Sequence, residues 1–405
     1  AQVINYCYET LYQKELNSNA NGSSGRAMAK RYGAYQLAVE LLELMSENCQ
    51  MGIPHRALRP ENRIEFMREC GFALLDVGEL EKARDCFLNA QRCFYGEERA
   101  VDEINIDLDL ALVESTRGKL SAARESIDTA MKKLQTLHSQ RQESDARQYY
   151  TVRSLYRRVL TREAHLVFLE GDHEQTLDLI DKIQNEKRWE QFKDGDRYRR
   201  DVLVPGFSQR LEAEQTHLLI AALHRRAESA EKEWKTSEFS LALNRCIEAM
   251  LRAQSEGLHH QAMGFRIALA RCFRRMERFD TAEAILDAVH LDLLRYGCSE
   301  RTFLSFLNEA GRVLAGLGDP IRAYATYLKP CFGRAKARGF RREAEQAAVL
   351  SVSVIEEIKR QYEQCQSSDD VHQASWLEVL APAKDKHRRL VKDADDLFRG
   401  GPFEK

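Results

Sequence analysis

The sequence predicts an all-α fold, a right-handed superhelix of about seven antiparallel helix pairs that ends in a C-terminal helical cap. Proline is scarce, at 7 of 405 residues, and Ala, Leu, Glu, Arg and Gln, which lose little conformational entropy in a helix, are abundant. The chain is longer than one compact core usually covers, which fits an elongated array. The third observation is a spacing of residues that recurs along the chain.

The segment LLDVGELEKARDCFLNAQRCF, residues 74–94, carries this spacing in full. Gly78 is followed by an apolar residue two positions later, a small one five later, an apolar one nine later and a small or apolar one twelve later. The small residue lets a second helix cross closely over the first, and the later positions continue its buried stripe. We call the residue in the place of Gly78 the turn anchor. The same register marks seven anchors: Gly33, Gly78, Gly118, Gly171, Ser237, Glu277 and Gly318.

A second small residue precedes most anchors by seven positions. It belongs to the first helix of each pair, at the point where the second helix must approach. The residues in this position are Gly71, Ala111, Ala164, Ala230, Ala270 and Gly311. Two sets of small residues in one register predict repeated helix pairs rather than an irregular bundle.

These positions resemble the tetratricopeptide repeat (TPR) family. The residues that match its pattern one by one are Gly71, Leu74, Gly78, Leu80, Ala83, Phe87 and Ala90, and the resemblance covers roughly residues 26–365. Successive anchors lie 45, 40, 53, 66, 40 and 41 residues apart, whereas the family's period is about 34, and its terminal proline is mostly missing. Longer helices, of about 16–18 residues, explain the longer period. The resemblance implies a TPR-like solenoid whose concave groove binds a protein or peptide partner.

Composition divides the chain into four parts. We expect N-terminal repeats over residues 1–190, with a flexible loop at 17–25, and an irregular insertion with a spacer helix over 191–233. C-terminal repeats then cover 234–365, and capping helices cover 374–399. Because the chain starts at Ala1 in mid-pattern, we expect it to be a fragment of a larger protein.

The resemblance also implies which side chains line the groove, at 13, 10, 6, 3 and 2 positions before each anchor. The polar candidates for partner binding in these positions are Arg68, Asn105, Arg158, His165, Arg271, Arg274, Arg275, Asn308 and Arg312. Arginines that converge bind carboxylates or phosphates through two parallel hydrogen bonds, so the C-terminal groove predicts an acidic partner segment. An equally good interpretation is a solvated helix face whose arginines form salt bridges with Glu277 or Glu309. The carboxylate clamp of chaperone-binding members is not reproduced.

Motifs for catalysis and cofactors are missing from the sequence. It contains no phosphate-binding loop, zinc-protease motif, nucleophile elbow or dinucleotide fingerprint, so we expect no enzyme, no cofactor and no metal site. Asp107 and Asp109 are two apart on a predicted helix and therefore face apart, so they do not form a carboxylate pair.

Charge and hydropathy limit the partners further. The net charge is −2, which argues against nucleic acid, although residues 334–343 form a local basic run. No apolar stretch is long enough to cross a membrane. Ten scattered cysteines without a paired spacing predict reduced thiols in the cytoplasm or the nucleus.

The predicted function is a non-enzymatic protein–protein interaction module, either a scaffold subunit or the partner-sensing arm of a larger intracellular signalling protein. It would bind a partner segment in its concave groove. The alternative is a regulator that senses a peptide or small molecule and changes its superhelix pitch on binding. The sequence carries no signal for an oligomeric state.

Overall fold

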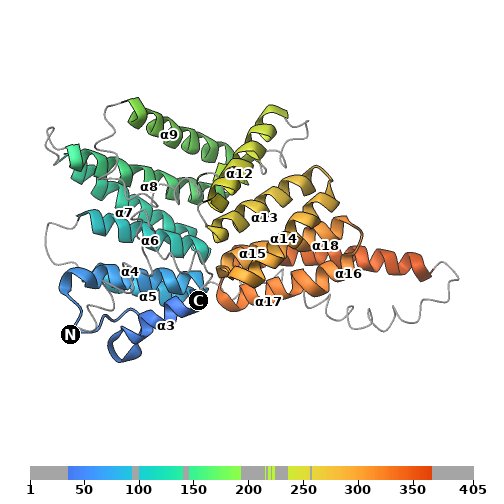
Figure 1. Cartoon of the computed structure of the whole chain (residues 1–405), viewed down its shortest axis with the longest axis horizontal. Helices are drawn as coiled ribbons and strands as arrows, with labels where there is room; N and C mark the ends of the chain where they lie inside the picture. The colour runs from blue at the N-terminus through green and yellow to red at the C-terminus, as the bar shows by residue number, and fades with distance from the viewer. Residues whose placement is uncertain are drawn as a thin grey trace. The chain divides into compact units, whose positions relative to one another are not determined.

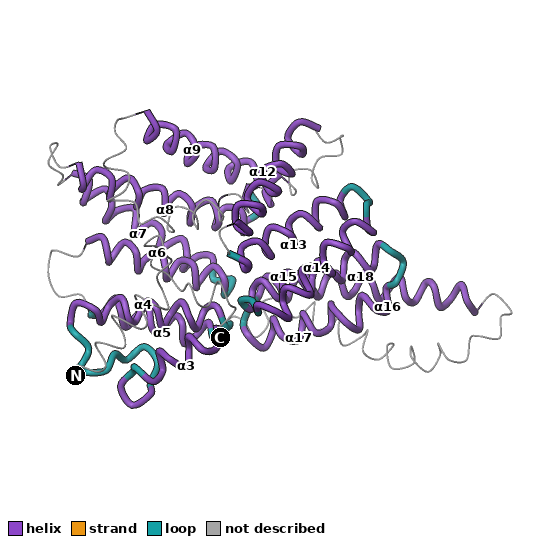
Figure 2. Tube along the Cα trace, in the orientation of Figure 1, coloured by secondary structure: helices purple, strands orange, loops and turns teal. Residues whose placement is uncertain are grey.

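The computed structural model describes residues 35–93, 100–139, 146–192, 215, 218–219, 221–223, 236–255 and 258–366. Within these ranges the chain is helical and contains no strand (Figures 1 and 2). The predicted loop at 17–25, the cap at 374–399 and most of the insertion at 191–233 lie outside the described residues, as does the anchor Gly33.

The chain divides into two compact units, and the division passes through two helices, α13 and α14. Unit 1 comprises Ala1–Ala268 and Arg295–Ser299, and unit 2 comprises Leu269–Leu294 and Glu300–Lys405. We describe each unit by itself. The sequence-based division into repeats at 1–190 and 234–365 stays a prediction.

The helices of unit 1 form consecutive pairs. Contacts join α4 to α5, α6 to α7 and α8 to α9, and also link neighbouring pairs through α5 with α6 and α7 with α8. The elements are α3 (Tyr35–Leu44), the 3-10 turn η2 (Glu47–Cys49), α4 (Pro60–Asp76), α5 (Leu80–Arg92), α6 (Ala100–Thr116), α7 (Leu120–Ser139), α8 (Ala146–Glu170), α9 (His173–Phe192) and α12 (Thr236–Ser255).

Unit 2 is built in the same way from the C-terminal half of α13 onward. The elements are α13 (His259–Arg275), α14 (Phe279–Tyr296), α15 (Glu300–Gly316), α16 (Pro320–Arg322), the π-helical segment η4 (Ala323–Leu328), α17 (Lys329–Arg338) and α18 (Arg341–Gln366). Helix α15 packs against the η4 segment, and α18 packs against both α15 and α17. The predicted all-α fold of TPR-like helix pairs is confirmed.

The turn anchors explain why these helices end where they do. Gly78 has a φ of 84°, and the N–H of Glu79 donates to the carbonyl of Leu74 at 2.8 Å, which is the Schellman pattern of a helix end. Gly118, Gly171 and Gly318 also have positive φ and repeat the hydrogen bond.

Two other anchors depart from glycine. Glu277 takes the same turn with a φ of 58°, although a side chain makes this conformation costly, and Arg278 N–H donates to Phe273 O at 2.9 Å. Ser237 instead lies within α12, so its assignment as a turn anchor was wrong.

The small residues before the anchors mark the closest helix crossings. A Cβ atom added to Gly71 would lie 2.7 Å from the ring of Phe87, and one added to Gly311 would lie 2.5 Å from Leu328. Phe87 and Leu328 belong to the second helix of each pair and are fully buried. The second helix therefore packs where the first one carries no side chain, as the sequence indicates.

The second helix of the last complete pair contains a proline. Pro330 lacks an N–H group, and the turn before it widens: Lys329 N–H donates to Tyr324 O, five residues back. Such π-helical turns absorb an irregularity without ending a helix. At the start of this helix Asp319 accepts a hydrogen bond from Arg322 N–H at 3.1 Å, which caps it.

We expect Gly311→Ala to lower the free energy of unfolding by about 1–3 kcal/mol, because its methyl group would displace Leu328. Gly333→Ala in α17 is the matched control, since its added Cβ meets nothing within 4 Å. The control should raise stability by about 0.5–1 kcal/mol through helix propensity. Urea unfolding monitored by circular dichroism measures both, and equal effects of the two substitutions would contradict the packing account.

Candidate functional site: buried carboxylates between first helices

A buried carboxylate lies nine positions before the anchor in three repeats. These residues are Glu69 on α4, Asp109 on α6 and Glu309 on α15, all on the first helix of a pair. A buried carboxylate is costly unless charged hydrogen-bond donors compensate it. The donors that compensate each carboxylate therefore show which contacts hold one repeat against the next.

Asp109 is fully buried and joins three first helices of unit 1. Arg68 from α4 donates through Nε to Asp109 Oδ2 at 2.9 Å, and its Nη1 donates to Glu65 Oε2 at 2.9 Å. Arg158 from α8 donates to Asn105 Oδ1, and its Nη2 lies 3.8 Å from Asp109 Oδ1. We call these five residues the Asp109 cluster.

The Asp109 cluster is balanced in charge, with two arginines and two carboxylates. Burial opposes the charged form of Arg68, but the nearby charges of Asp109 and Glu65 raise the pKa of Arg68 above its ordinary value. Its Nε and Nη1 donate to carboxylates, and its Nη2 lies 2.9 Å from Asp109. The cluster therefore connects neighbouring repeats and has its positive charge matched internally.

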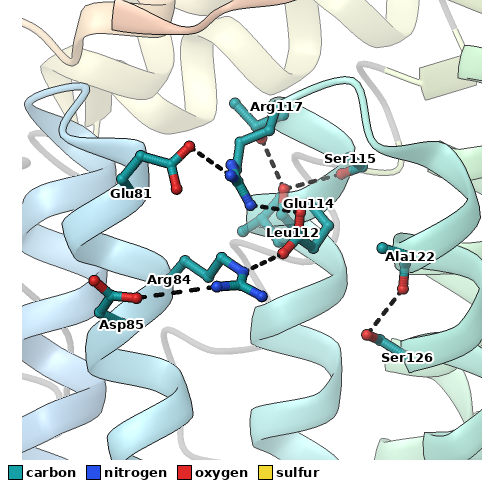
Figure 3. Close-up of polar contacts among 10 residues, drawn as sticks. Glu81, Arg84, Asp85, Leu112, Glu114, Ser115, Arg117, Ala122 and Ser126 are labelled. Carbon is teal, nitrogen blue, oxygen red and sulfur yellow. Dashed lines mark hydrogen bonds and ion pairs between the residues drawn. The ribbon is translucent and has the colours of Figure 1, made fainter. Parts of the chain in front are cut away.

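A second network of ion pairs lies between α5 and α6 (Figure 3). Glu114 is buried and accepts hydrogen bonds from Arg84 Nε at 2.6 Å and Arg117 Nη1 at 2.8 Å. Arg117 also donates to Glu81 at 2.5 Å, and Arg84 lies 4.0 Å from Asp85. Two arginines thus face three carboxylates, so this network has no excess of positive charge.

Glu309 is the centre of a different cluster in unit 2. Only 1% of its surface is exposed. Arg274 Nε donates to Glu309 Oε1 at 2.6 Å, and Arg271 Nε donates to Glu309 Oε2 at 3.1 Å. Arg312, one turn along α15, adds its charge to the same carboxylate. We call Arg271, Arg274, Glu309 and Arg312 the Glu309 cluster.

The electrostatics of Glu309 follow from these neighbours. Burial alone would raise the pKa of Glu309, but the charges of Arg271, Arg274 and Arg312 and the hydrogen bond from Arg274 lower it to about 2. The carboxylate is therefore ionised at neutral pH. Arg271 and Arg274 thus share one carboxylate, whereas Arg68 of the Asp109 cluster contacts two.

Two arginines of this cluster contact the carboxylate through the same atom of the guanidinium group. Both Arg271 and Arg274 donate to Glu309 through Nε. Arg274 Nη2 is buried and has no hydrogen-bond acceptor among the residues that the structure describes. A buried donor without an acceptor is costly, so the cluster has hydrogen-bonding capacity that Glu309 does not use.

The nine predicted groove residues therefore lie in different surroundings. Arg68, Asn105 and Arg158 meet in the Asp109 cluster, and Arg271, Arg274 and Arg312 meet around Glu309. His165 is buried, Asn308 is buried with its Nδ2 3.5 Å from Glu343 O, and Arg275 is half-buried. The ion pairs with Glu309 that the sequence offered as the alternative are present, but around a buried carboxylate rather than on a solvated face.

The buried carboxylates themselves were not among the predicted site residues. Asp109 reaches Arg68, whereas Asp107, two positions earlier, lies 2.9 Å from Lys133 Nζ and accepts a hydrogen bond from Gln91. The two aspartates thus face apart, as their spacing indicates. The signal that would have found Asp109 and Glu309 is their common distance of nine residues from the anchor.

The basic run at 334–343 is engaged within unit 2. Arg334 donates to Glu300 Oε2 at 2.7 Å and lies over the ring of Phe303, 4.8 Å from its centroid. Arg341 pairs with Glu345 at 2.8 Å. These contacts use part of the positive charge within the fold.

Metal ligation and membrane insertion are two further possibilities for a helical chain. In the described part of the chain, no group of three or more His, Cys, Asp or Glu side chains could hold a metal ion. Every helix in the same ranges is too short or too polar to cross a membrane.

We expect Glu309→Gln to destabilise the protein by about 3 kcal/mol at neutral pH, from the shift of the carboxyl pKa from 4.5 to about 2. A lowered pKa contributes stability above pH 4.5, and this contribution is lost as the pH falls through about 2. The difference between wild type and variant, from urea unfolding at pH 7 and pH 3, should therefore shrink at the lower pH.

Glu357→Gln is the control for this measurement, since Glu357 pairs with Arg360 on the surface of α18 and should contribute little. A Glu309→Gln effect that is the same at both pH values would contradict the electrostatic account.

In comparisons with known proteins, no family model and no curated protein matches the sequence. Among solved structures, the chain is similar to a Rap protein complexed with competence and sporulation factor, with a TM-score of 0.49 and 15% identity over 87% of this chain and 81% of that one.

The chain also matches the TPR2AB domain of yeast Sti1 in a complex with pHSP90 (TM-score 0.25, 12% identity, 71% of this chain and 99% of that one). The TPR domain of P58(IPK) matches with a TM-score of 0.20 and 14% identity over 89% of this chain and 95% of that one. These TM-scores describe a loose likeness of fold.

Proposed function

We propose that this chain is a non-enzymatic protein–protein interaction module that binds an acidic segment of a partner on the first helices of unit 2. The observation that carries the proposal is the Glu309 cluster, in which Arg271 and Arg274 both donate hydrogen bonds to one buried carboxylate and Arg312 adds its charge to it. The other two clusters match their arginines with carboxylates. An excess of arginine held in fixed positions favours a ligand with negative charge.

An extended protein segment suits this arrangement better than a compact ligand. The positively charged residues belong to two successive first helices, α13 and α15, and Asn308 of α15 lies within 3.5 Å of α18. Repeat proteins bind extended segments across such neighbouring elements, since each repeat adds a few contacts. As an intracellular scaffold or the partner-sensing arm of a longer protein, the module would act through this surface.

The test places a photo-crosslinking residue, benzoylphenylalanine, at Ser305 on the first helix α15, four residues before Glu309. We expect acidic 12-residue peptides, selected from a display library with the whole chain, to crosslink at this position. Binding should weaken as salt is added, because it depends on charge.

The matched control carries the same crosslinker at Asp287, an exposed residue of the second helix α14. Crosslinking at 287 in place of 305, or selection of peptides without acidic residues, would contradict the proposal.

A further inference from the structure

The second helix α14 has leucines where its counterparts have charged or polar side chains. Fourteen positions after the turn anchor, α5 has Arg92 and α7 has Lys132, and both are exposed, whereas α14 has Leu291 there. Seventeen positions after the anchor, α7 has the exposed Gln135 and α14 has Leu294. The two leucines are 57% and 73% exposed. Since the other repeats place charges at these positions, the repeat fold itself does not require the leucines, and neighbouring exposed apolar residues indicate an interaction surface.

This surface extends toward the start of α14 through two alanines. Ala284 and Ala288 are exposed, and with the two leucines they follow the spacing i, i+4, i+7 and i+10, which places residues on one helical face. In the position of Ala284, α5 has Asp85 and α7 has Glu125, both exposed. Small residues on a helix face allow another helix to approach closely. We call Ala284, Ala288, Leu291 and Leu294 the α14 face.

Opposite charges flank the α14 face symmetrically. Asp287 lies four residues before Leu291 and Arg295 four residues after it, and both are exposed on this one helix. Ala288 and Leu294 likewise lie three residues before and three after Leu291. If the helix packs antiparallel against a copy of itself with a two-fold axis at Leu291, each residue of these pairs meets the other one on the copy. The face is therefore complementary to itself.

We propose that two copies of this chain associate through antiparallel α14 helices. Asp287 then pairs with the partner's Arg295, and the symmetry forms the same pair a second time. Leu294 packs against the partner's Ala288, a large side chain beside a small one, and Leu291 meets its own copy at the axis. A contact of this kind closes after two copies. The residues of the proposed function belong to the first helices α13 and α15, so this inference goes beyond that function and does not depend on it.

A second copy suits the α14 face better than a segment of one charge. An acidic segment would meet the like charge of Asp287, and a basic segment would meet that of Arg295. A copy in the antiparallel register meets an opposite charge at both places. Exposed ion pairs contribute little affinity, but like charges opposite each other are unfavourable, so the two charges select this register.

Sedimentation equilibrium of the whole chain, over concentrations from about 1 to 200 μM, measures the association. We expect a reversible dimer with a dissociation constant in the micromolar range, because one helix from each copy buries less than the area of about 800 Å² per partner of a standard interface. Leu291→Glu places two like charges at the axis and should weaken the dimer by about a hundredfold. Leu251→Glu on α12 is the matched control, since Leu251 is 55% exposed, and it should leave the dissociation constant unchanged.

Charge exchange tests the register. Asp287→Arg and Arg295→Asp should each weaken self-association by about tenfold, because each creates two pairs of like charge. An equimolar mixture of the two variants should associate again, since every pair between the two chains then joins opposite charges. Both residues are exposed, and circular dichroism checks that each variant keeps the fold.

Three results would overturn the inference. The first is a wild-type chain that stays monomeric at the highest concentration. The second is a dimer that survives Leu291→Glu, because the copies would then meet elsewhere. The third is a mixture of the charge variants that stays monomeric, because the register would then be wrong. These results are independent of acidic-peptide binding, so the proposed function is decided by its own test.

Discussion

A buried carboxylate that accepts hydrogen bonds from arginines of a neighbouring first helix is the interaction on which this structure depends. Helix pairs bury their apolar faces only against adjacent pairs, and a buried charged contact between pairs further constrains the register between them. Asp109 and Glu309 fix it in the two units, because each would be strongly unfavourable without the arginines that reach it. The small residues and left-handed turns shape each pair, and the carboxylates join the pairs.

The two units differ in how many carboxylates each buried arginine contacts, and this difference distinguishes a structural contact from the proposed binding site. In unit 1, Arg68 reaches both Asp109 and Glu65, so its charge is matched within the fold. In unit 2, Arg271 and Arg274 share one carboxylate. The contact that joins the repeats in unit 1 is thus, under the proposed function, also the contact that presents arginines to a partner in unit 2.

Much of the fold could be predicted from the sequence, because it depends on local spacing. The anchors Gly78 and Gly318 and the close approach at Gly311 follow from helical geometry within about twenty residues. The site was only half predictable. The positions of Arg271 and Arg274 follow from the repeat register, but their partner lies 38 and 35 residues away. A charged residue on a predicted helix favours a solvent-facing position, and only tertiary packing shows that it is buried.

The most direct test of the account is a double-mutant cycle between Arg274 and Glu309, with Arg274→Met, Glu309→Gln and the double variant compared by urea unfolding. We expect a coupling free energy of about 1–3 kcal/mol, as for residues in one buried network, and a double variant less destabilised than the sum of the single variants. A coupling near zero would contradict the claim, because it would show that the two residues lie together without depending on each other.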